Sequence, residues 1–157
     1  MTIADHMNIQ GYVTMQLCDS RQRPVKQIRV KNKIVTDGRE LVARQFAGET
    51  IAKVSHLAVG TGGLESADQP ETVLANNEEL QNEVYRRPID TTEVLPHEDG
   101  WKVVLTTTLP ADEANAALTE AGLFNGADAA KMYNRVTFKP INKSENFTLT
   151  LKWEIIF

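Results

Sequence analysis

The sequence predicts a mainly β protein, an antiparallel β-sandwich with one flanking α-helix. Apolar and polar residues alternate with period two in several runs, most clearly over 147–157, as in strands with one buried face. Turn-forming Pro, Gly and Asn residues separate these runs at short intervals, which is typical of sandwiches and barrels. No helix-length segment recurs between the runs, so parallel βαβ winding is not expected. The length of 157 residues suits one domain, expected to span 1–157.

The last strand is the most clearly patterned element. Every odd position of the run 147–157 is apolar, and the residues between them are mostly Thr, Lys and Glu. The predicted core stripe is Phe147, Leu149, Leu151, Trp153, Ile155 and Phe157. The run 101–109 repeats the pattern, beginning with Trp101. We therefore expect both tryptophans to face the core, on strands rich in Thr and Val.

Six further runs are predicted strands on the same grounds. They are 11–19, 27–35, 53–60, 83–94, 118–124 and 131–138. The turn signals around them are Pro24, Pro96 with Asp99-Gly100, Pro110 with Asp112, Asn125-Gly126, and Pro140 with Asn142. Within the run 83–94, Pro88 donates no ladder hydrogen bond, which places this strand at a sheet edge or a bulge.

One helix is predicted, over about 38–47. Asp37 can cap it, and Glu40 stands three residues later to complete a capping box. Gly48 can take the left-handed conformation that ends a helix. The polar segment 61–82 is interrupted by Pro70 and is expected to be a long surface loop with one short helical turn around 73–80.

No catalytic, cofactor or metal signature is present in the sequence. The histidines His6, His56 and His97 are isolated, and Cys18 is the one cysteine, so neither a zinc motif nor a disulfide is expected. The glycines at 60–63 lack the Lys and Ser/Thr of a phosphate loop and are better explained as a strand exit with unusual backbone angles. We therefore expect no enzyme and no cofactor.

The charge balance and the termini exclude further classes. A net charge of −4 disfavours general nucleic-acid binding, and no run is long and apolar enough for membrane insertion. The first residues also lack the basic and apolar regions of a signal peptide.

Two small charged groups are the candidate interface residues. Glu78, Glu79 and Glu83 cluster on or beside the polar loop, where hydration alone explains them. Arg86 and Arg87 precede Pro88 on the expected edge strand. They can meet an acidic partner surface, or they can be the solvated charges that protect an edge strand from pairing.

Several segments taken in order resemble the attachment domain of tailed-phage, myophage-type tail fibres and its small stand-alone versions. They are HLAVGTGG (56–63), NEVYRRPID (82–90), GWKVVLTTTLP (100–110), LTEAGLFNG (118–126) and the closing MYNRVTF and LTLKWEIIF. In LTEAGLF, Gly122 is expected to allow close backbone approach, while the leucines and Phe124 fill the core. The resemblance covers the chain from His56 onward, with KNKIVTDGRELVARQFAG (31–48) as a looser match.

The resemblance implies a non-catalytic virion structural protein, assembled in the host cytoplasm, that joins tail parts as a baseplate, collar or fibre-adaptor subunit. Fibres of this family are trimeric, so a homo-oligomer, either a trimer or a ring, is expected, with other tail or baseplate proteins as partners. Because no shaft follows Phe157, we expect a connecting role and not receptor contact. The interfaces are expected on the loop 61–82, the Arg86–Arg87 edge and the segment 1–10.

Two alternatives remain open from the sequence. A capsid decoration or cement protein needs a similar small β-domain without catalysis. A carbohydrate-binding host-attachment module needs exposed aromatic residues, which the expected burial of both tryptophans disfavours.

Overall fold

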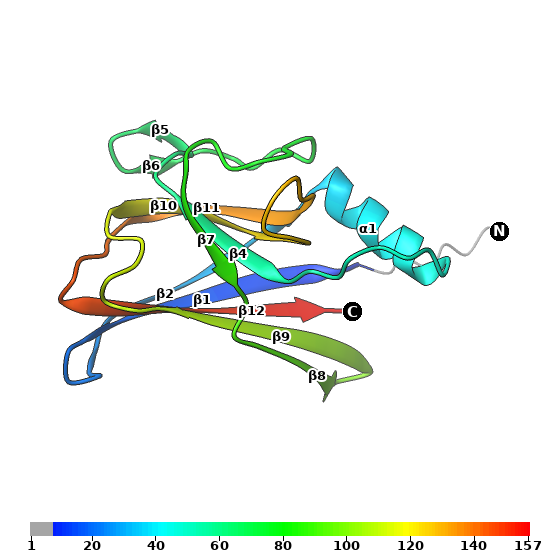
Figure 1. Ribbon diagram of the computed structural model, residues 1–157, viewed down its shortest axis with the longest axis horizontal. Helices are drawn as coiled ribbons and strands as arrows, with labels where there is room; N and C mark the ends of the chain where they lie inside the picture. The colour runs from blue at the N-terminus through cyan, green and yellow to red at the C-terminus, as the bar shows by residue number, and fades with distance from the viewer. Residues whose placement is uncertain (1–7) are drawn as a thin grey trace.

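The computed structural model describes residues 8–157, in which two five-stranded antiparallel sheets pack face to face (Figure 1). The first sheet has the order β2 (Pro24–Lys31), β1 (Gln10–Asp19), β12 (Phe147–Ile156), β9 (Gly100–Leu109), β8 (Thr91–His97). The second has the order β3 (Lys33–Ile34), β11 (Met132–Asn142), β10 (Ala117–Phe124), β4 (His56–Gly60), β7 (Glu83–Pro88). The helix α1 (Thr36–Phe46) flanks one end. The predicted fold class is confirmed.

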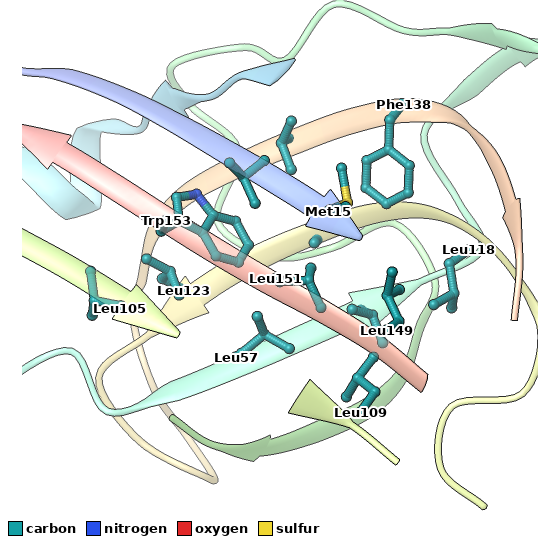
Figure 2. Close-up of a cluster of buried hydrophobic side chains, with 14 of the residues drawn as sticks. Met15, Leu57, Leu105, Leu109, Leu118, Leu123, Phe138, Leu149, Leu151 and Trp153 are labelled. Atoms are coloured by element: carbon teal, nitrogen blue, oxygen red, sulfur yellow. The ribbon is translucent and has the colours of Figure 1, made fainter. Parts of the chain in front are cut away.

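The core lies between the sheets and follows the predicted alternation. On β12, Leu149, Leu151 and Trp153 are fully buried, and Trp153 is paired with Val13 of β1. Figure 2 shows these side chains pointing toward Leu57 and Leu123 of the second sheet. Phe147 is only half-buried and Phe157 is 40% exposed, so the two ends of the predicted stripe lie at the margins of the core.

Two predicted strands are each divided between the sheets. The run 27–35 forms β2 in the first sheet and β3 in the second, and the run 83–94 forms β7 and β8. At the second crossing, the Ile89 N–H donates to Ser55 O while the Asp90 N–H donates to Thr106 O. Consecutive amides thus bond to opposite sheets, which alternation of side chains alone does not reveal. The edge position predicted for Pro88 is confirmed, because β7 is the last strand in the order of the second sheet, next to β4.

The helix begins earlier than predicted and without a capping box. Val35 is the N-cap residue and makes no side-chain cap, while Asp37 lies within the first turn. The Thr36 N–H donates to Ala75 O at 2.7 Å, so the loop 61–82 supplies an acceptor for one of the first N–H groups of the helix, which have no partner within it. At the other end the prediction is confirmed, since Gly48 has φ +82°.

Three local predictions differ from the structure. The loop 61–82 contains a short hairpin, β5 (Leu64–Ser66) with β6 (Gln69–Pro70), and around 73–80 it forms no helix but a single turn, in which the Asn77 N–H donates to Leu74 O at 3.1 Å. Pro140 lies inside β11 and not in a turn, at a bulge in the pairing with β10 that tolerates its missing donor. Trp101 is 55% exposed, because β9 begins before the opposite sheet covers its inner face. No helix within residues 8–157 is long and apolar enough to cross a bilayer.

Candidate functional site

A buried ion pair lies beneath the loop 61–82. Glu120 of β10 has no exposed surface, and Arg135 of the neighbouring β11 is 3% exposed. Nη2 and Nε of Arg135 donate to Oε2 of Glu120 at 2.6 and 3.1 Å. Both charges stand in strands that are otherwise largely apolar, so each needs the other to offset the cost of its removal from water.

The carboxylate of Glu120 also holds both ends of the loop. Its Oε1 accepts hydrogen bonds from the main-chain N–H groups of Gly62 at 3.1 Å and Asn82 at 2.7 Å. Its Oε2 accepts a third from Gln81 N–H at 3.0 Å. A Cβ at Gly60 or Gly62 would lie 2.7 Å from Oε1 of Glu120, which explains both glycines. The third, Gly63, has φ +80°, as expected for an unusual strand exit.

The middle of the loop is held by the rest of the same network. Nη1 of Arg135 donates to Oδ1 of Asn77 at 2.9 Å, and Nη2 lies 2.9 Å from Oε1 of Glu71. The Thr137 hydroxyl donates to Glu71 O at 2.6 Å. The loop is therefore tied to the second sheet at its two ends and at two points between, and it presents a defined surface.

The sequence analysis assigned no role to Glu120 or Arg135. The motif LTEAGLF was explained by Gly122, and that explanation is confirmed, since a Cβ there would lie 2.8 Å from Asn134 O. The available signal was one acidic residue in a strand that is otherwise apolar except for Thr119, and one arginine in the next strand, which has several polar residues. A single buried charge predicts a partner but not which residue supplies it.

Glu78 and Glu79 line a hollow of about 500 Å³ on the outer side of this loop. The other lining residues are Asp37, Asn76, Asn77, Ala130 and Lys131. Lys131 is engaged by Oε2 of Glu40 at 3.2 Å. The Arg44 guanidinium, together with Lys131, holds the pKa of Glu40 below its ordinary value. The hollow therefore presents carboxylates from two elements, α1 and the loop 61–82, with one already paired cation.

The other predicted interface residues have internal partners. Nη2 and Nε of Arg86 bind the two oxygens of Glu83 at 2.6 and 3.1 Å, and its guanidinium lies 3.8 Å from the Phe124 ring centre. Arg87 donates to Thr108 O at 2.9 Å and to Oε2 of Glu113 at 2.7 Å. The structure thus joins Glu83 to Arg86, whereas Arg87 connects the edge strand to the first sheet.

The arrangement offers surfaces for contact with other molecules. Among residues 8–157, no three His, Cys, Asp or Glu side chains are grouped in a way that could hold a metal ion. His56 Nδ1 lies 2.9 Å from the Ser55 hydroxyl. His6 and most of the expected interface segment 1–10 lie outside the described residues.

A comparison with protein families places the fold in context. Residues 30–148, more than half of the chain, match the family model described as phage tail-collar fibre protein, N-terminal. The matched range contains the loop 61–82, Glu120 and Arg135. No curated protein and no solved structure matches the chain.

Proposed function

Since this chain belongs to the family described as phage tail-collar fibre protein, N-terminal, and is a structural component of a phage tail, we propose that it is a non-catalytic connector. It joins tail parts, as a baseplate, collar or fibre-adaptor subunit, through self-association and through contact with other virion tail proteins. The connecting surface that we propose is the loop 61–82 with its acidic hollow.

The observation that carries this proposal is the anchoring of the loop. Loops in compact domains usually tolerate changes of sequence and length. A loop can be held without a buried ion pair, whose removal from water is costly. Here Glu120 accepts three loop N–H groups, and Arg135 binds two loop side chains. Preorganisation of this kind lowers the entropic cost of binding, which favours a docking surface.

The chemistry of the hollow indicates the kind of partner. Glu78 and Glu79 are exposed, and Asp37 lies beside them. A partner with Lys or Arg side chains complements this surface, and complementary charge steers docking and fixes its orientation. Glu83, Arg86 and Arg87 border the loop on the edge strand β7, and we include them in the proposed interface as its rim.

Charge reversal tests the proposal without disturbing the fold. Glu78→Lys/Glu79→Lys leaves the Glu120 network intact, whereas deletion of the loop would remove the Glu71 and Asn77 partners of Arg135. The matched control is Glu93→Lys/Glu145→Lys, two exposed carboxylates elsewhere that have no ion-pair partner within residues 8–157.

The measurement is the amount of each variant retained in purified particles from a host complemented with it. We expect the Glu78/Glu79 variant to be depleted and the control variant to be incorporated as the wild type is. Equal incorporation of both variants would contradict a docking role for the hollow.

One observation favours a second candidate, the carbohydrate-binding module. Trp101 is 55% exposed, and an exposed tryptophan can stack on a sugar ring. Glycan binding by the purified protein that is lost in Trp101→Ala, with unchanged stability, would support this alternative. The decoration alternative is tested by imaging of labelled protein on intact particles, where signal around the capsid shell would support it.

A further inference from the structure

At one end of the sandwich, which we call the open end, α1 and the β8–β9 hairpin lie apart (Figure 1). A cavity of about 260 Å³ opens there between the sheets. Its apolar wall comes from the helix and from both sheets: Val42, Val54, Val103, Leu105, Leu123, Tyr133, Ile155 and Phe157. Lys53, Gln45 and Thr92 complete its lining.

Exposed aromatic and aliphatic side chains border this cavity. Trp101 is 55% exposed, Val94 is 63% exposed and Phe157 is 40% exposed. Val94 pairs with the cavity residue Val103, and the Phe157 N–H donates to Trp101 O at 2.9 Å, so these residues adjoin the cavity. By strand alternation, Trp101 extends the inward face of Val103 and Leu105 past the edge of the opposite sheet.

The helix contributes to the same border. Phe46, 95% exposed, lies one turn beyond the cavity residue Val42 and next to Gln45. The other large apolar side chains exposed within residues 8–157, apart from Leu95 of β8, are Val25, Leu74 and Val84, each on a different segment. Single exposed apolar residues are ordinary, but a patch continuous with an apolar cavity marks an interaction site.

Unpaired charges of opposite sign lie at the two sides of the open end. Lys53 at the cavity has no ion-pair partner within residues 8–157, and neither do Glu98 and Asp99. Glu98 and Asp99 form the tip of the β8–β9 hairpin, just before Trp101. One chain therefore carries an aromatic projection with acidic flanks and an apolar cavity with a basic flank.

We propose that the open end binds the open end of a second copy of this chain. Trp101 of one copy enters the cavity of the next, and its acidic hairpin tip meets Lys53 there. The contact that we propose runs in one direction, from the projection of one copy to the cavity of the next, so it is heterologous and forms a ring where the rotation between copies closes. This inference deepens the proposed function, on whose self-association it rests.

The test is the molar mass of the purified full chain by light scattering across a concentration series. Trp101→Ser should raise the dissociation constant of the oligomer by about 30-fold or more, as for a central aromatic hot spot. Val25→Ser, at a similarly exposed (52%) apolar residue on β2, is the matched control and should leave the constant unchanged.

Charge exchange gives a second, independent measurement. Lys53→Glu alone should weaken the oligomer by about 10-fold at low salt, and combination with Glu98→Lys/Asp99→Lys should restore it. A monomeric wild type, an oligomer indifferent to Trp101→Ser, or no restoration by the exchanged charges would each overturn the inference. Particle retention of Glu78→Lys/Glu79→Lys reports on the proposed function separately, so either can fail alone.

Discussion

Glu120 is the residue on which the arrangement of the loop depends. It uses both carboxylate oxygens to bind five N–H groups, three from the main chain of the loop and two from Arg135. A neutral residue at this position would leave the guanidinium without its closest counter-charge. The loss of one partner from a buried pair is therefore far more harmful than the loss of an exposed pair.

We expect Glu120→Gln to lower the free energy of unfolding by about 3–5 kcal/mol, the usual cost of a buried charge that loses its partner. Urea denaturation at neutral pH measures this. Glu83→Gln, which breaks the partly exposed pair with Arg86, is the control and should cost at most about 1 kcal/mol. Equal effects of the two substitutions would show that Glu120 is not the anchor.

Tyr133 gives the protein a dependence of stability on alkaline pH. Burial raises the pKa of its phenol to about 12 from an ordinary value of 10.0. The folded state therefore retains the proton over a range in which the unfolded chain loses it. The contribution of the protonated Tyr133 to the free energy of unfolding is fully present below about pH 10. It is lost as the pH rises toward about 12, which lowers the free energy of unfolding by about 2–3 kcal/mol in total.

Tyr133→Phe should remove that loss, and at pH 7 it should leave stability unchanged or raised, because the buried hydroxyl has no partner within residues 8–157. Unfolding midpoints in urea from pH 7 to pH 11 measure both effects. Tyr12→Phe, at a half-buried tyrosine whose hydroxyl donates to Gln10, is the control. If Tyr133→Phe keeps the wild-type decline above pH 10, the phenol is not the group that causes it.

At the scale of elements, the strands with one solvent-exposed face were predictable, and the points where the chain passes from one sheet to the other were not. The alternation on β1, β9 and β12 indicated which residues are inside, and pairing of Val13 with Trp153 agrees with it. The division of 83–94 at Ile89 and Asp90 depends on hydrogen bonds to two different sheets. Those bonds leave the polar and apolar pattern unchanged, so no periodicity reveals them.

The same limit explains the misplacement of Trp101. Its alternation with Val103 and Leu105 is correct, but burial also needs an opposite sheet, whose extent is a tertiary property. The anchor under the loop was missed for a related reason. Glu120 and Arg135 become a pair only through the register of β10 against β11, which sets Glu120 beside Thr137 and Gly122 opposite Arg135.

The two tryptophans test the assignment of strand faces. Trp153→Ala should cost about 3–5 kcal/mol, as for other large aromatics removed from a core, whereas Trp101→Ala should cost far less. Thermal or urea unfolding of both variants at low protein concentration measures the difference without a contribution from self-association. Similar losses of stability for the two variants would mean that the opposite sheet covers β9 at its start, where Trp101 lies.

The glycines at the entry of the loop test its close approach to β10. Gly62→Ala should destabilise by about 1–3 kcal/mol, because the new Cβ would lie 2.7 Å from Oε1 of Glu120 and 2.6 Å from Cβ of Gln81. Gly126→Ala, where the nearest atom is 3.4 Å from the new Cβ, is the matched control and should be nearly neutral. A neutral Gly62→Ala, measured by urea unfolding, would contradict the tight junction described here.

At the scale of the whole molecule, two surfaces of different chemistry lie on one rigid sandwich. The loop 61–82 presents carboxylates around a hollow, and the open end presents Trp101 beside an apolar cavity. A connector needs at least two such surfaces, one for its own copies and one for a different protein. Many weak contacts of this kind hold an assembly together, since each bound neighbour raises the effective concentration of the next.

The central claim is that this chain connects parts of a tail through the anchored loop. An electron cryo-microscopy map of the intact particle, at a resolution that traces main chains, tests it most directly. We expect the chain in the tail, with Glu78 and Glu79 facing basic side chains of another tail protein. A chain located on the capsid shell, or one in the tail whose loop 61–82 faces solvent on every copy, would contradict the claim.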